Sequence, residues 1–190
     1  MQRRDFLRVF GAASALTLLP HEAEAAWLRV AAGRRPSNAL SDAQLAFIGA
    51  LGDTILPRTD SPSATDVAVP AFVDVIVSEN YSDPERAAFL KGLDAIDAQV
   101  RVATGSSFAD LTPDARGTQV QTLESATDRR SEPTRTYWRL KSLIVHGYFT
   151  SEPVMKGVLK VEIMPGAFNG SAPMPTAVAP PSTRGSHEHV

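Results

Sequence analysis

Apolar residues recur at helical spacing in five stretches of the chain. An α-helix repeats every 3.6 residues, so apolar side chains at i, i+3, i+4 and i+7 share one face. The five faces are Phe47, Ile48, Leu51 and Ile55; Val69, Phe72, Val73 and Ile76; Phe89, Leu90, Leu93, Ile96 and Val100; Val120 and Leu123; and Tyr137, Leu140, Ile144 and Tyr148. The pattern predicts an all-α fold, with a single small domain of about five helices.

Capping residues and glycine mark the ends of these helices. Ser41 with Gln44 three residues later predicts a capping box at the start of the first helix. Asp83 before Pro84 predicts the cap of the third helix, and Gly105 is typical of its end. These signals place the helical domain at about residues 41–166.

Three other stretches have a different composition. Residues 57–70 are rich in Pro, Ser, Thr and Asp and predict a loop. Residues 154–166 are compatible with either a helical turn or a short strand. Residues 167–190 contain many prolines and small residues, which predicts an extended or disordered tail.

The first 25 residues have the layout of an export signal. The apolar run over 9–19 is too short to span a bilayer. It follows a pattern that resembles a bacterial twin-arginine (Tat) signal, formed by Arg3, Arg4, Phe6 and Leu7. Small residues at Ala23 and Ala25 predict cleavage after Ala25. We therefore expect a signal peptide over 1–25, a polar lead over 26–40, and export of a folded protein to the periplasm.

Composition excludes several classes of function. The 190 residues include no cysteine, which excludes disulfides, a thiolate nucleophile and a Cys-ligated metal, and argues against a structural lipoprotein-like or envelope protein. The net charge of −2 argues against binding to nucleic acid, which needs a basic patch.

Residues that could carry chemistry are scarce. The sequence shows no nucleophile elbow, phosphate loop or dinucleotide-binding glycine motif, so we predict no catalytic, cofactor-binding or metal-binding residues in this chain. His146 lies among apolar residues and is expected to be a hydrogen-bonded helix histidine. The alternative is a stand-alone periplasmic enzyme or ligand-binding domain that uses His146 and a nearby acid.

Two blocks of sequence resemble the gluconate 2-dehydrogenase subunit 3 family. The first block, over 49–77, is carried by Asp53, Pro57, Thr59, Asp60, Pro62 and Pro70, among others. The second, over 143–170, is carried by Gly147, Tyr148, Phe149, Thr150, Ser151, Glu152, Pro165 and Gly166. The resemblance covers about residues 40–170.

This resemblance implies a role in a larger complex. Members of the family are small, or gamma, subunits of membrane-associated FAD-dependent dehydrogenases for sugars and sugar acids. The implied partners are a large FAD-bearing catalytic subunit of the glucose-methanol-choline (GMC) type, in many complexes a multi-haem cytochrome c subunit, and the Tat translocase. The small subunit is not the catalyst. It supplies the export signal and supports maturation of the flavoprotein.

The second block and the residues after it are candidates for the partner interface. Aromatic anchors carry most interface energy, and extended segments wrap large surfaces. The candidates are Tyr148, Phe149, Thr150, Ser151, Glu152, Met155, Leu159, Ile163, Pro165 and Gly166. A place in the core is an equally good expectation for Tyr148. Pro153 stands where the family commonly has glycine, which predicts an extended backbone at Glu152.

Overall fold

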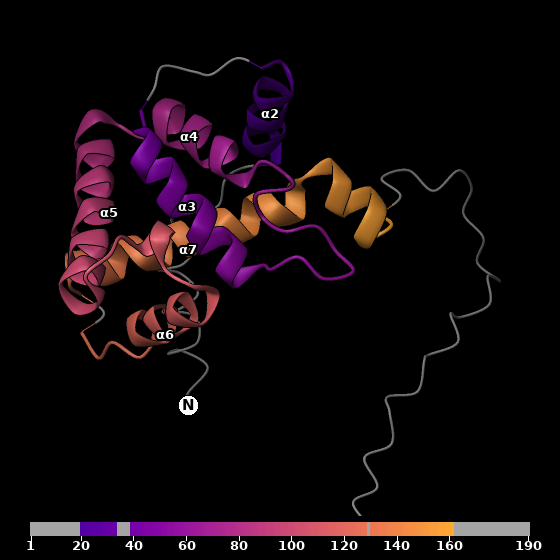
Figure 1. Cartoon of the computed structure of the whole chain (residues 1–190). Helices are drawn as coiled ribbons and strands as arrows, with labels where there is room; N and C mark the ends of the chain where they lie inside the picture. Colours follow the sequence, from indigo (N-terminus) through magenta and orange to yellow (C-terminus); the bar gives the residue numbers. More distant parts are fainter. Residues whose placement is uncertain (1–19, 34–38, 129, 162–190) are drawn as a thin grey trace, which may run out of the picture.

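The protein is a bundle of α-helices. A computed structural model describes residues 20–33, 39–128 and 130–161 (Figure 1). The described chain contains α2 (Pro20–Ala31), α3 (Asp42–Ile55), α4 (Val69–Asn80), α5 (Asp83–Thr104), α6 (Pro113–Glu124) and α7 (Glu132–Thr150), with short turns η2 (Phe108–Asp110) and η3 (Val154–Val158). The all-α prediction is confirmed, and the five predicted helices are α3 to α7.

The long helix α7 organises the core. It packs against α2, α4, α5 and α6, and in Figure 1 it crosses behind α3. The predicted apolar faces of α4 and α7 are buried, and Phe72, Ile76, Tyr137 and Ile144 have no exposed surface. Burying a side chain of this size contributes about 1.5–3 kcal/mol. By contrast, α6 has no fully buried residue, and its Val120 only partly covers the core.

Helix ends follow the capping signals with one correction. The predicted box at Ser41 is present, with the Gln44 N–H donating to Ser41 Oγ at 3.2 Å. The predicted cap at Asp83 is wrong, because Ser82 is the N-cap of α5. The Ser82 N–H donates to the carboxylate of Glu85 at 3.1 Å, and Asp83 is the first residue inside the helix.

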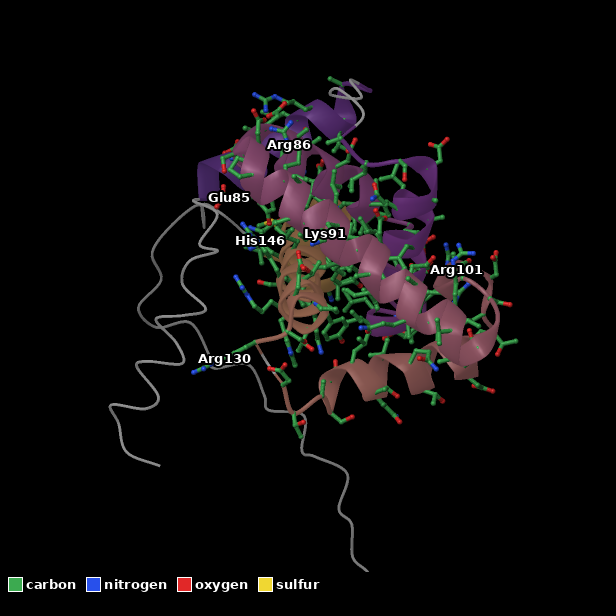
Figure 2. The ribbon with its side chains drawn as sticks, turned by 90° about the vertical axis from the view of Figure 1, so that its left-hand side faces the viewer. Glu85, Arg86, Lys91, Arg101, Arg130 and His146 are labelled. Atoms are coloured by element: carbon green, nitrogen blue, oxygen red, sulfur yellow. The ribbon has the colours of Figure 1, made fainter. Side chains whose placement is uncertain are left out.

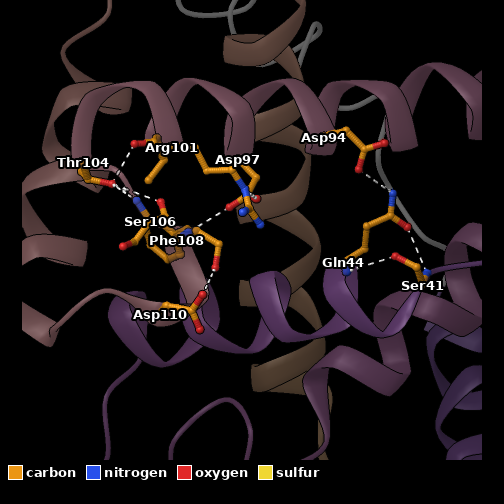
Figure 3. A network of polar contacts seen from close by, with 11 residues as sticks. Ser41, Gln44, Asp94, Asp97, Arg101, Thr104, Ser106, Phe108 and Asp110 are labelled. Atoms are coloured by element: carbon orange, nitrogen blue, oxygen red, sulfur yellow. Dashed lines mark hydrogen bonds and ion pairs between the residues drawn. The ribbon is translucent and has the colours of Figure 1, made fainter.

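Polar side chains connect α3, α5 and η2 (Figure 3). Gln44 Nε2 on α3 donates to Asp94 on α5 at 2.9 Å. Asp97, one turn further along α5, accepts from the Phe108 N–H at 2.8 Å and from Arg101. Because Phe108 itself is fully buried, this carboxylate fixes the turn that places its ring in the core.

Helix α2 is the largest difference from the sequence prediction. The expected polar lead over 26–40 is wrong for 26–31, which form the second half of this helix. Ala23, Ala26, Trp27 and Val30 follow the i, i+3, i+4, i+7 rule, and Ala23 and Ala26 are buried. The same small residues also fit a signal-peptide cleavage site, so the sequence pattern alone does not identify the helix.

The predicted signal residues Arg3, Arg4, Phe6 and Leu7 lie outside the described residues, as does the predicted tail over 167–190. In the part of the chain that is described, no helix has the length and apolar character needed to cross a bilayer.

Candidate functional site

The first signature block is a loop that folds back on α3. Asp53, near the end of α3, accepts hydrogen bonds from the Thr65 N–H at 2.9 Å and from the Thr65 hydroxyl at 2.7 Å. The Ala64 N–H donates to the carbonyl of Leu56. Asp53 therefore holds the C-terminal part of the loop, at Thr65, against the end of α3.

A second carboxylate closes the loop internally. Asp66 accepts from the Ser63 N–H at 2.7 Å and pairs with Arg58. The Ser63 N–H and the guanidinium of Arg58 lower the pKa of Asp66. The Thr59 hydroxyl donates to Asp60 at 2.9 Å. These polar residues hold one another, as turn-forming residues commonly do.

The two signature blocks pack directly on each other. The Tyr148 hydroxyl on α7 donates to the carbonyl of Pro62 in the loop at 2.8 Å. A Cβ atom at Gly147 would lie 2.7 Å from Cδ1 of Phe72, which belongs to the first block. Only glycine allows the Phe72 ring to lie this close to α7. The structure thus brings together residues that are about 80 positions apart.

Comparison with known families places the chain. Residues 42–166 match Gluconate 2-dehydrogenase subunit 3, and this match spans 125 of the 190 residues and contains the first block and residues 143–166 of the second. The chain belongs to this family. No curated protein and no solved structure shows a significant match.

In this subunit 3 chain, the predicted interface residues divide into two groups. Tyr148 and Ser151 are buried, and the Ser151 hydroxyl donates to the carbonyl of Tyr148 at 2.7 Å. Thr150 and Met155 are half-buried. Ile163, Pro165 and Gly166 lie outside the described residues.

The exposed group lies at the end of α7 and at or just after the end of η3. Phe149 at the end of α7 is 45% exposed, and Leu159, just after η3, is 46% exposed. Val158 and Val161 are exposed to a similar degree. We call Phe149, Val158, Leu159 and Val161 the apolar end. In the described part of the second block, these are the large apolar side chains that remain exposed, and the charged Glu152 and Lys156 are exposed beside them in the chain.

The backbone at Glu152 differs from the prediction. Glu152 is helical, and the extended residue is Ser151, at φ −68° and ψ 141°. Ser151 ends α7 and lets a new turn begin, so Pro153 lies in a first turn, where its missing N–H costs nothing. Glu152 is exposed and pairs with Lys156, which lowers the pKa of Glu152.

His146 lies on α7 beside the core (Figure 2). Its ring centroid is 6.3 Å from that of Phe72. The expected hydrogen bond is absent at Nε2, which is buried without a protein partner in the described chain. Burial lowers the pKa of His146. Among the described residues, no carboxylate is hydrogen-bonded to Nε2.

Other candidate sites are weak. Among the described residues, no three His, Asp or Glu side chains gather in a way that could hold a metal ion. A shallow groove of about 520 Å³ is lined by residues 39–42, Gln44, Leu45 and Asp74. Asp74 accepts a hydrogen bond from the Leu40 N–H at 3.1 Å. The carboxylate therefore holds the backbone just before α3 against α4.

Sequence reasoning missed the contacts of Trp27. The indole stacks on Phe72, with ring centroids 5.0 Å apart, and Nε1 donates to Thr150 Oγ1 at 3.0 Å. Trp27 thereby contacts one residue from each signature block. The helical spacing from Ala23 to Val30 is the signal that identifies it.

Proposed function

We propose that this chain is the non-catalytic small subunit of an FAD-dependent sugar or alcohol dehydrogenase complex. It binds the large GMC-type subunit that carries FAD, and its Tat signal takes the pair to the periplasm and supports maturation of the flavoprotein. In complexes that include one, a multi-haem cytochrome c subunit takes the electrons onward, and the chain is membrane-associated through the complex. Membership in the subunit 3 family supports this role.

The observation that carries the proposal is the apolar end. Its four large side chains, Phe149, Val158, Leu159 and Val161, all lie within residues 149–161 and remain exposed. Exposed apolar patches on a soluble domain mark interaction sites. We assign the apolar end as the contact with the flavoprotein, with Phe149 as its aromatic anchor.

A pull-down of the co-expressed flavoprotein tests this contact. We expect Phe149→Ser to weaken the complex by about tenfold or more, since aromatic anchors commonly contribute over 1.4 kcal/mol. Val102→Ser is the matched control, because Val102 is 90% exposed on α5, outside the apolar end. Both variants should melt like the wild type. Equal loss of binding in both, or in neither, contradicts the assignment.

Fractionation of cells tests the export role. We expect Arg3→Lys with Arg4→Lys to leave both proteins in the cytoplasm, because Tat signals require the arginine pair rather than positive charge. Arrival of the flavoprotein in the periplasm with the double-lysine signal contradicts the escort role.

Purification of the chain alone tests its lack of catalysis. We expect no flavin absorbance and no dye-linked oxidation of sugars, because the sequence has no motif that would hold the cofactor. Turnover by the lone chain would favour the alternative enzyme.

A further inference from the structure

Helix α2 is packed into the domain by apolar and polar contacts. Ala23 and Ala26 are each 2% exposed, which places both at a close helix contact. The helix packs on α4 and α7, and Figure 1 shows it beside α4. Arg29, further along the helix, pairs with Glu79 of α4. The helix is therefore held along most of its described length.

The contact with Trp27 connects α2 to the signature blocks. The indole lies on Phe72 at an interplanar angle of 23°, and its Nε1–H donates to Thr150. Thr150 in turn donates to the carbonyl of His146 at 2.8 Å, which fixes the position of its hydroxyl. Detachment of α2 would expose part of Phe72, an otherwise fully buried ring.

These contacts lie on both sides of the predicted cleavage bond. Ala23 is two residues before the bond between Ala25 and Ala26, and Ala26 and Trp27 follow it. The backbone at this bond is helical, so its N–H and C=O groups are engaged within the helix. Proteolysis of a structured segment proceeds through its open form, so a packed helix is a poor substrate.

We propose that α2 is a docked strap that protects the Ala25–Ala26 bond, so that removal of the export signal requires α2 to detach from Phe72 and Thr150. The proposal rests on the export signal proposed above. It makes processing depend on the state of the folded domain: a molecule in which α2 is docked keeps its signal, and a molecule in which α2 has detached loses it.

A cleavage assay with purified bacterial signal peptidase tests the strap. The substrates are the full chain and a synthetic peptide of residues 9–33, which contains the same bond without the domain. Mass spectrometry follows the product that begins at Ala26. We expect the full chain to be cut at least tenfold more slowly than the peptide. Equal rates overturn the proposal.

Variants on the domain separate docking from recognition of the bond. Thr150→Val with Glu79→Gln removes the polar contacts of Trp27 and Arg29 without changing any residue near the bond. We expect this double variant to be cut at least threefold faster than the wild-type full chain, with faster hydrogen exchange at the amides of 26–31.

The matched control is Thr118→Val with Glu132→Gln. The Thr118 hydroxyl bonds within α6, and Glu132 pairs with Lys91, so neither contacts α2. This control should be cut at the wild-type rate. If Thr150→Val with Glu79→Gln is cut no faster than this control, the proposal is overturned. Resistance of the peptide itself also overturns it, because the bond is then no processing site, while the pull-down still tests the escort role independently.

Discussion

Tyr148 and Phe149 are neighbours in the chain, but they have opposite environments. Tyr148 is buried and bonded to Pro62, whereas Phe149 is 45% exposed. The two rings meet edge to face, with centroids 5.3 Å apart and an interplanar angle of 88°. The last turn of α7 therefore has a structural side, which holds the first block, and an exposed side, which is available to a partner. The second signature block therefore contains both a residue that stabilises the fold, Tyr148, and a residue that is exposed to a partner, Phe149.

The largest expected effect on stability comes from adding a side chain at Gly147, where α7 contacts Phe72. We expect Gly147→Val to destabilise the domain by about 3 kcal/mol, because the new side chain meets the Phe72 ring, with its Cβ only 2.7 Å away. For a protein of this size the melting temperature should fall by roughly 6–12 °C.

The matched control for this change is Gly117→Val on α6. A Cβ at Gly117 meets nothing within 4 Å, and valine has a higher helix propensity than glycine. Its melting temperature should stay the same or rise slightly. An equal loss in both variants would show that β-branching in a helix, rather than contact with Phe72, causes the effect.

The next largest effect on stability is expected from removing the hydroxyl of Tyr148, compared with adding one to Phe149. We expect Tyr148→Phe to cost about 1 kcal/mol, because the Pro62 carbonyl loses its donor. Phe149→Tyr adds a hydroxyl to the exposed ring and should leave stability within about 0.5 kcal/mol of the wild type. Chemical denaturation measures both. Equal stability of Tyr148→Phe and the wild type would mean that the link between the blocks contributes nothing.

The sequence predicted the helices better than their contacts. Periodicity located α3, α4, α5 and α7, because each buries an apolar face, and α6, whose Val120 and Leu123 are partly buried against the core. It could not show that Tyr148 meets Pro62, because that contact depends on how the loop folds. It also could not decide between Tyr148 and Phe149, since adjacent aromatic residues at a helix end have equal apolar character. Helix α2 was missed because alanines fit both a close helix contact and a cleavage site.

A smaller effect is expected from His146, on the structural side of α7. Burial holds its pKa in the folded state below its value of about 6.5 in the unfolded chain. Between these two values the unfolded state binds more protons, so this contribution to stability is complete above pH 6.5 and is lost as the pH falls.

Denaturation midpoints at pH 7.5 and 5.5 test this contribution. We expect the wild type to lose stability between these values, and His146→Leu to lose less. The comparison of the two proteins isolates His146 from other groups that titrate. Parallel losses in both proteins would assign the pH dependence to other residues.

The smallest effect concerns the first block, where the loop enters α4. Ala68 has φ 58° and ψ 31°, a left-handed conformation that costs an L-residue about 1–2 kcal/mol. Glycine avoids this cost but adds about 0.4–1 kcal/mol of entropy to the unfolded chain. We therefore expect Ala68→Gly to stabilise the domain by about 0.5 kcal/mol, whereas Ala98→Gly on the exposed face of α5 should destabilise it by about 1 kcal/mol. Urea denaturation of the two variants measures the difference, and a loss of stability in both would contradict the backbone strain assigned to Ala68.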